Sequence, residues 1–117
     1  MNFNIHQKVI FAARSGNLEL VKERVSEGGD VNYQDPMHGS ALVTAIHNYD
    51  DTLVEWLIAN GADVNLVNEH GIGPLEVALH SNSKPSIVKQ LTWSGAKLNK
   101  KSRQYYSQRL EACLING

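Results

Sequence analysis

Apolar residues occur along this chain in short segments with helical spacing. Near its centre, residues 42–46 and 53–58 each place apolar side chains three and four positions apart. This spacing puts them on one face of an α-helix, so each segment is predicted to be a helix with one buried side. Both segments are shorter than an isolated helix that is stable in water. The pattern therefore predicts paired short helices that depend on packing against their neighbours.

A pentad that begins with glycine divides the chain into repeating units. Its copies are Gly28–Asn32, Gly61–Asn65 and Gly95–Asn99, and their first glycines are separated by 33 and 34 residues. The additional residue of the third unit falls in segment 81–84. Upstream of each pentad, the corresponding small residue is Ala12, Ala45 or Ala78. A fixed period of this length indicates a repeat architecture, in which successive units bury their apolar faces against one another.

Several residues mark the predicted ends of these helices. Gly61 and Gly95 follow the last apolar turn of a helix, where a left-handed residue ends the helix at no side-chain cost. Asn65 is expected to hydrogen-bond to nearby backbone and to hold the turn into the next unit. Pro85 suits the first turn of a helix, and Ser83 before it is the predicted N-cap.

The repeating unit resembles the ankyrin repeat over nearly the whole chain. The family pattern runs from an acidic or amide residue and a glycine through a Thr-Pro-Leu-His turn and a paired-alanine helix. It continues with a Val-x-x-Leu-Leu helix and a Gly-Ala-x-x-Asn loop. The matching positions are Ala12, Ala13, Gly16, Asn17, Val21 and Asn32 in the first unit, Asp35, Leu42, Ala45, Val54, Leu57 and 61–65 in the second, and Asn68, Gly71, Pro74, Leu75 and Ala78 in the third.

The resemblance implies an all-α fold, an ankyrin-repeat solenoid of stacked helix-turn-helix units with β-hairpin loops. About three and a half repeats fit the chain, which is identified as a small stand-alone member of the family. A single domain would cover residues 1–117, with an N-capping repeat at 1–34, repeats at 35–67 and 68–101, and a partial C-capping repeat at 102–117. Capping units with polar outer faces keep a solenoid soluble. The pattern leaves open whether the last unit contains one helix or two.

The chain departs from the family pattern at its turns and corners. Segments 40–43 and 73–76 replace the turn tetrad and lose its histidine. That histidine ties adjacent turns in the family, so somewhat looser stacking is expected here. Gly39 stands one position later than the usual glycine, which makes the geometry of the first hairpin uncertain. Tyr49 and Asn82 occupy the region of the inter-helix glycine, so these corners are expected to be remodelled.

Composition and charge limit the classes of molecule that this chain is expected to bind. Hydrophobic content of 42% and charged content of 20% are typical of a folded globular chain. With 11 basic and 12 acidic residues, the formal net charge of −1 gives no long-range attraction to nucleic acid or anionic lipid. No apolar stretch is long enough to span a membrane, and the N-terminal residues do not resemble a secretory signal. The single cysteine, Cys113, fits a reducing compartment, so a cytoplasmic location is expected.

Two surface features have more than one interpretation. Trp56 and Trp93 fall on the predicted outer helices, where packing between those helices is favoured and a contact site on the convex side is the alternative. A basic cluster covers residues 97–109 and has Tyr105 and Tyr106 beside it. A solvated final hairpin and cap is the favoured interpretation, and contact with an acidic partner surface or with nucleic acid remains open.

No motif for catalysis or metal binding stands out. His47 and His80 fall at the same place in successive units, but two imidazoles do not complete a zinc site. His38 and His70 lie at predicted hairpin tips. The segment 71–73 has the glycines of a turn, and neither a nucleophile elbow nor a phosphate-binding glycine loop is present. We therefore predict a protein that is not an enzyme and needs no cofactor or metal, with a histidine-based site as the rival hypothesis.

The resemblance places partner binding on the concave side, formed by hairpin tips and inner helices. Positions that vary between units there are rich in the side chains that interfaces favour. They are Arg14, Ser15, Tyr33, Gln34, Pro36, Met37, His47, Asn48, Glu69, His70, Ile72, His80, Ser81, Arg103, Gln104 and Tyr106. The predicted function is a protein-protein interaction module, monomeric when unbound. Alternatives are an immunity-type protein of bacteria that occludes the active site of a cognate toxin, and a self-associating structural protein.

Overall fold

A computed structural model describes residues 3–116, which contain seven helices and no strand. The helices are α1 (Ile5–Arg14), α2 (Leu18–Ser26), α3 (Ala41–His47), α4 (Asp51–Ala59), α5 (Pro74–His80), α6 (Pro85–Trp93) and α7 (Lys100–Asn116). The predicted all-α class is confirmed. The molecule is elongated, with principal extents of 43 × 27 × 20 Å.

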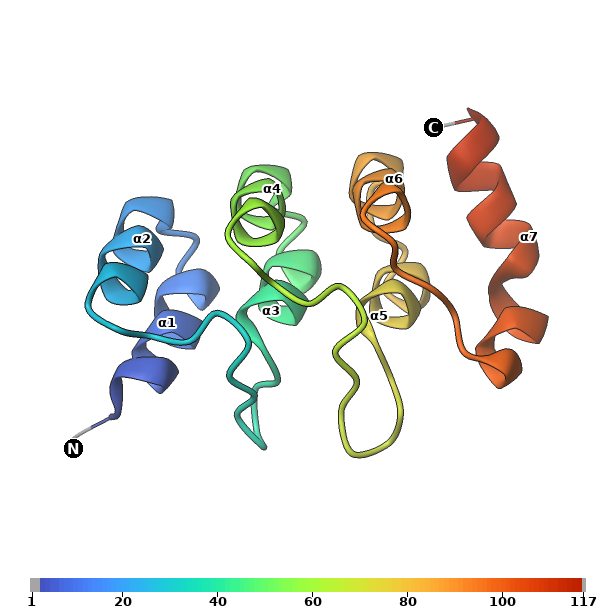
Figure 1. The fold of residues 1–117 in the computed structure, drawn as a ribbon. Coiled ribbons are helices and arrows are strands. Elements are labelled where there is room, and N and C mark those ends of the chain that lie inside the picture. Colours follow the sequence, from blue (N-terminus) through green and yellow to red (C-terminus); the bar gives the residue numbers. More distant parts are fainter. Residues whose placement is uncertain (1–2, 117) are drawn as a thin grey trace.

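The first six helices form three pairs that repeat along the long axis (Figure 1). Within each pair, the inner helix (α1, α3 or α5) packs against the outer helix that follows it (α2, α4 or α6). Inner helices also pack on inner helices, and α4 packs on α6, so two layers run through the stack. This translational order is that of a repeat solenoid.

One continuous core runs between the two layers. On the inner helices, Ala45 and Ala78 have no exposed surface, which allows neighbouring helices to approach closely. On the outer helices, Leu53, Leu57 and Leu91 are equally buried. Complete burial of a leucine side chain contributes about 1.5–3 kcal/mol. Helices of seven to ten residues are therefore stabilised by packing rather than by their own length.

The residue before each of four helices acts as its N-cap. The capping side chains, which accept the N–H three residues later at 2.8–3.2 Å, are Asn4, Asn17, Ser40 and Asp50. Pro85 lies in the first turn of α6 as predicted, but the prediction that Ser83 caps this helix is wrong. The additional residue of this unit delays the helix by one position, so Lys84 stands at the N-cap.

The corners between paired helices are the same in all three units. Gly16, Tyr49 and Asn82 have positive φ angles of 71°, 54° and 57°. In each corner, this residue donates its N–H to the carbonyl three positions back, and the next N–H donates to the carbonyl five positions back. The expectation of remodelled corners is therefore wrong. Tyr49 and Asn82 adopt the left-handed conformation in place of glycine, at a cost of about 1–2 kcal/mol each.

Asparagine side chains connect successive units. Asn65 donates from Nδ2 to the carbonyl of Gly95 at 2.9 Å and accepts from the N–H of Lys97 at 2.9 Å. Asn32 repeats this pair of hydrogen bonds one unit earlier, at 3.0 and 2.7 Å. The sequence predicted bonds to nearby backbone, whereas these side chains reach the loop of the following unit. Gly61 and Gly95 have φ angles of 98°, which confirms their role at helix ends.

Two polar side chains form further contacts between successive units. Glu76 accepts the N–H of Gly73 at 2.8 Å through Oε1 and the N–H of Asn99 at 3.1 Å through Oε2. Gln7 donates from Nε2 to Oδ2 of Asp35 at 3.3 Å. Glu76 therefore ties the turn at 73–76 to the last unit, and Gln7 ties the first unit to the loop of the second. The looser stacking expected from the loss of the histidine stays a prediction.

Two loops project beyond the inner helices (Figure 1), the first loop (residues 34–39) and the second loop (residues 67–72). Each loop turns back on itself as a hairpin does. The first has a single antiparallel bridge between Asp35 and Gly39, and in the second Asn68 donates its N–H to the carbonyl of Ile72 at 3.0 Å. A single paired position does not form a strand, so the two loops are turns rather than the expected β-hairpins.

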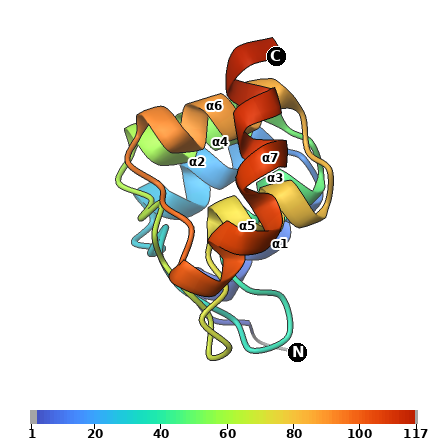
Figure 2. The same ribbon diagram turned by 90° about the vertical axis from the view of Figure 1, so that its right-hand side faces the viewer.

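The last unit contains one helix, α7, which crosses the end of the stack and packs on α5 and α6 (Figure 2). Asn99 starts this helix directly after the pentad, because its Oδ1 accepts the N–H of Ser102 at 2.7 Å. Arg103, Gln104 and Tyr106 therefore lie on a helix, and their prediction as hairpin-tip residues is wrong.

The two tryptophans occupy different environments. Trp56 is half-buried and packs against the core. Trp93 is 78% exposed, so its predicted packing between outer helices is wrong. The reason is its position, because Trp93 is the last residue of α6 whereas Trp56 lies one turn before the end of α4.

Candidate functional site

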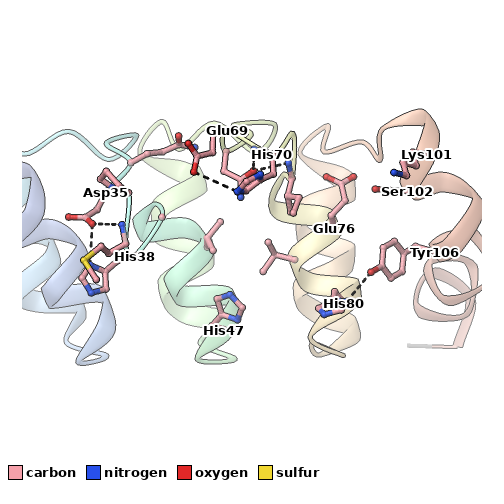
Figure 3. A pocket seen from close by; sticks show the side chains of 18 of the residues that line it. Asp35, His38, His47, Glu69, His70, Glu76, His80, Lys101, Ser102 and Tyr106 are labelled. Carbon is pink, nitrogen blue, oxygen red and sulfur yellow. Dashed lines mark hydrogen bonds and ion pairs between the residues drawn. The ribbon is translucent and has the colours of Figure 1, made fainter.

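A cavity of about 790 Å³ opens between the two loops, in front of α3 and α5 and beside α7 (Figure 3). Among the residues predicted for the binding face, those that line it are Gln34, Pro36, Met37, His47, Glu69, His70, Ile72, His80 and Tyr106. The structure therefore brings residues from four units to one face.

The first loop is shaped by the carboxylate of Asp35, which is buried at 7% exposure. Its Oδ1 accepts the N–H of Met37 at 2.8 Å and lies 3.3 Å from Nδ1 of His38. Its backbone exchanges two hydrogen bonds with Gly39, at 2.8 and 2.9 Å. The hydrogen bond from Met37 is the main cause that lowers the pKa of Asp35 below its ordinary value of 3.8. Gln7 and His38 act in the same direction, and burial opposes them.

The lowered pKa of Asp35 predicts an acid-sensitive contribution to stability. Because the folded state favours the ionised carboxylate, the contribution is complete above pH 3.8 and is lost as pH falls through the lower folded-state pKa. The Asp35→Asn variant keeps an acceptor oxygen but no charge. We expect the stability difference between the two proteins to shrink as pH falls below about pH 4, measured by urea unfolding. Parallel pH profiles would contradict this role.

The second loop uses an amide where the first uses a carboxylate. Asn68 Oδ1 accepts the N–H groups of His70 and Ile72 at 2.8 and 3.1 Å, and its carbonyl accepts the N–H of Gly71 at 3.0 Å. Each loop tip is thus held by one short polar side chain. Gln34 also connects the loops, because its Nε2 donates to the carbonyl of Val67 at 3.0 Å.

The loops carry apolar side chains into solvent above an apolar floor. Met37 in the first loop is 86% exposed, and Ile72 in the second is 42% exposed. Val43 on α3 and Val77 on α5 are half-buried and line the cavity between them. Tyr105 on α7 is 76% exposed at the far side. Exposed apolar groups gathered around one cavity are typical of an interaction site rather than of ordinary surface.

Polar groups surround this apolar centre. His47 and His80 end α3 and α5, and Nδ1 of His80 lies 3.0 Å from the hydroxyl of Tyr106 (Figure 3). Nε2 of His70 lies 3.6 Å from Oε1 of Glu69, an ion pair only when the imidazole is protonated. Within residues 3–116, no three His, Cys, Asp or Glu side chains are grouped as a metal site requires. The arrangement offers hydrogen bonds to a partner.

Some of the predicted binding residues form contacts between successive units. Asn48 donates from Nδ2 to the carbonyls of Ala13 and Arg14 at 3.3 and 3.2 Å, which caps the end of α1. The carbonyl of Ser81 accepts the hydroxyl of Tyr49 at 3.0 Å. These side chains and carbonyls link one unit to the next. The predicted residues that lie outside the cavity are Arg14, Ser15, Tyr33, Asn48, Ser81, Arg103 and Gln104.

Tyr33 and Arg103 are held by other contacts. The ring of Tyr33 stacks on His6 with centroids 5.4 Å apart, and Nδ1 of His6 accepts the N–H of Asp30 at 2.9 Å. Arg103 donates from its guanidinium to the carbonyl of Leu98 at 3.4 Å, on another face of α7. Neither side chain reaches the cavity.

The cavity also contains residues that were not among those predicted for the binding face. They are Asp35, His38, Gly39, Val43, Asn68, Glu76, Val77, Lys101, Ser102 and Tyr105. Val43 and Val77 could have been found from the helical pattern, since they lie four and three residues before His47 and His80, which were predicted for the binding face. Lys101 and Tyr105 could not, because their placement depends on α7 being one continuous helix.

No helix within residues 3–116 combines the length and the apolar character needed to cross a bilayer.

Comparison with known proteins matches the repeat over most of the chain. A family model described as ankyrin repeats (3 copies) matches residues 9–102. The chain is 43% identical over 67 residues to the potassium channel AKT1 of Arabidopsis thaliana, covering 57% of this chain and 8% of that protein. It is 36% identical over 91 residues to a putative ankyrin repeat protein of Rickettsia felis, covering 77% and 23%. It is 35% identical over 85 residues to the RelA-associated inhibitor of Mus musculus, covering 73% and 10%.

The chain therefore spans less than a quarter of the length of each of these relatives.

Proposed function

Because the chain belongs to the ankyrin-repeat family, whose members are in general protein-interaction modules, we propose that it is a non-catalytic module that binds another protein. Binding takes place through the face that carries the two loops and the cavity between them. The observation that supports this most directly is the pair of exposed apolar side chains, Met37 and Ile72, which flank the half-buried floor of Val43 and Val77.

The scaffold suits recognition by a rigid surface. The loops are held by buried or paired polar side chains at their bases, such as Asp35 and Asn68, and need little reordering when a partner arrives. Pre-organisation of this kind lowers the entropic cost of binding. A standard interface takes about 800 Å² from each partner, which the loops, inner helices and α7 together can supply.

The relatives support binding rather than a shared activity. A potassium channel and an inhibitor carry related repeats, although the two are different kinds of protein. What they share with this chain is the repeat region, so the identity of the partner cannot be transferred from either one. We propose that this chain is a monomer in the cytoplasm until it meets its partner.

The test begins with affinity purification of the partner from the native host, followed by titration of the purified partner. The Met37→Asp/Ile72→Asp double variant removes both apolar anchors from the loops. We expect it to weaken binding at least tenfold, a cost of about 1.4 kcal/mol or more. Trp93→Asp is the control, because it places a carboxylate at an exposed apolar position on an outer helix.

The control should change affinity less than twofold, and light scattering should show a monomer before the partner is added. A partner that binds the double variant normally and loses affinity for Trp93→Asp would refute the proposed face.

A further inference from the structure

A second hollow lies at the C-terminal end of the stack, on a different face of α7 from the cavity. This groove has a volume of about 430 Å³. Its lining residues are Leu75, Thr92, Ala96, Lys97, Leu98, Arg103, Ser107, Leu110, Glu111, Leu114 and Ile115. None of them lines the cavity between the loops.

The groove is open because α7 has no paired helix within residues 3–116. Each of the other inner helices packs against an outer helix that follows it, whereas α7 packs only on α5 and α6. Tyr106, Leu110 and Cys113 form the stripe that faces the core. Leu114 and Ile115, on the neighbouring stripe, are 37% and 70% exposed. An apolar strip of α7 therefore faces solvent where an inner helix elsewhere in this fold is covered.

The spacing of this stripe fits a helix as occupant. Arg103, Ser107, Glu111 and Leu114 follow one another at intervals of four and three residues along α7. Rows of this spacing form the ridges between which the side chains of a second helix pack. With 17 residues, α7 is long enough to accompany such a helix for about 25 Å.

Charge indicates which kind of helix the groove would accept. Residues 1–66 contain nine acidic and four basic residues, a net charge of −5, while residues 67–117 contain seven basic and three acidic residues, a net charge of +4. In the groove, Lys97 and Arg103 are exposed cations, and Glu111 is the one carboxylate. A partner with acidic flanks is attracted to this end. Two copies that meet through it symmetrically repel each other.

We propose that this groove binds an acidic amphipathic helix of a partner protein, which covers Leu110, Leu114 and Ile115 with its apolar face and pairs its carboxylates with Lys97 and Arg103. The mode is that of a helix docked in a hydrophobic groove. It is independent of the cavity between the loops, so either surface can be tested without the other.

The chain itself supplies matched probes for this site. A peptide copy of residues 50–60 is an amphipathic helix with three acidic residues and no basic one, and a copy of residues 84–94 has a similar apolar stripe with two basic residues and no acidic one. Both are made helical by a staple between positions seven apart, 52 and 59 or 86 and 93, all of which are exposed in the protein. Binding of each fluorescent peptide to the full chain is followed by anisotropy at low and high salt.

We expect the acidic peptide to bind at least tenfold more tightly than the basic one and to lose much of this advantage at high salt. Leu114→Ser/Ile115→Ser should weaken its binding at least tenfold, and Lys97→Glu/Arg103→Glu should reverse the preference between the peptides. All four side chains are exposed, so circular dichroism should show that the variants remain folded. Met37→Ser/Ile72→Ser is the control and should have no effect.

Three results would overturn the proposal: absence of binding by both peptides, equal binding by both, or binding lost only in the control variant. A fourth is self-association of the full chain that Leu114→Ser/Ile115→Ser abolishes, since this would assign the groove to a second copy. Because the control variant disrupts only the loop cavity, failure here and failure of the proposed function remain distinguishable.

Discussion

Replacing Leu57 by alanine is expected to lower the free energy of unfolding by about 3 kcal/mol, the largest stability effect that we predict for a single substitution. Leu57 lies on α4 in the central unit, has no exposed surface and belongs to the continuous core. The truncation removes apolar contacts and leaves a cavity within this core. Because short repeat arrays are stabilised by contacts between neighbours, the loss should affect the whole molecule rather than one pair of helices.

Urea unfolding followed by circular dichroism measures this effect, and Leu114→Ala is the matched control. The same substitution at Leu114, which lies near the end of α7 and is 37% exposed, should lower the free energy of unfolding by less than about 1 kcal/mol. Equal losses in the two variants would mean that the central unit is no better packed than the end of the chain.

Gly29→Ala is expected to destabilise the protein by about 2 kcal/mol, although alanine is the residue at this position in the other units. A Cβ at Gly29 would clash with Cγ2 of Val9 and would lie 2.9 Å from the carbonyl oxygen of Arg24. Gly29 and Val9 are both buried, and the backbone carbonyl has no rotamer to change. The first unit therefore packs its helices more closely around the pentad than the later units do.

The reverse change, Ala62→Gly, is the control in the second unit and should cost less than about 1 kcal/mol, through chain entropy alone. Without a clash, Gly29→Ala would stabilise the protein by about 0.4–1 kcal/mol, because alanine reduces the freedom of the unfolded chain. Thermal or urea unfolding shows whether Gly29→Ala raises or lowers the free energy of unfolding, and this direction decides whether the close approach exists.

Much of the fold could be predicted from the sequence because repetition supplies independent observations of one unit. The glycine-led pentads located the helix ends, and both Gly61 and Gly95 have the expected left-handed conformation. Details that depend on one residue were less predictable. Tyr49 and Asn82 preserve a corner that glycine normally forms, since backbone hydrogen bonds outweigh their conformational cost. The N-cap of α6 moved from Ser83 to Lys84 because of one inserted residue.

The residues of the candidate site that lie on the loops could be predicted from the sequence. Those on α7 could not, because the directions of their side chains depend on where that helix begins. Met37, Glu69, His70 and Ile72 line the cavity as the repeat register suggested. The last unit was harder, because its sequence does not show where a hairpin is replaced by helix. Arg103 and Gln104 were placed on a hairpin, but continuous helix in α7 directs them away from the cavity and brings Lys101 and Tyr105 to its edge instead. The side of a helix on which a residue lies can be assigned only when the residues that begin and end the helix are known.

Hydroxyl-radical footprinting of the complex with the captured partner tests the central claim, that the face between the loops is the binding surface. Met37 on the loop face and Trp93 on an outer helix are both reactive side chains, and they are 86% and 78% exposed. Their oxidation in one sample therefore distinguishes the loop face from the outer helices as the binding surface. The account predicts that the partner slows the oxidation of Met37 at least fivefold and leaves Trp93 unchanged, an effect on the order of what complete burial produces. Protection of Trp93 with unaltered oxidation of Met37 would contradict it.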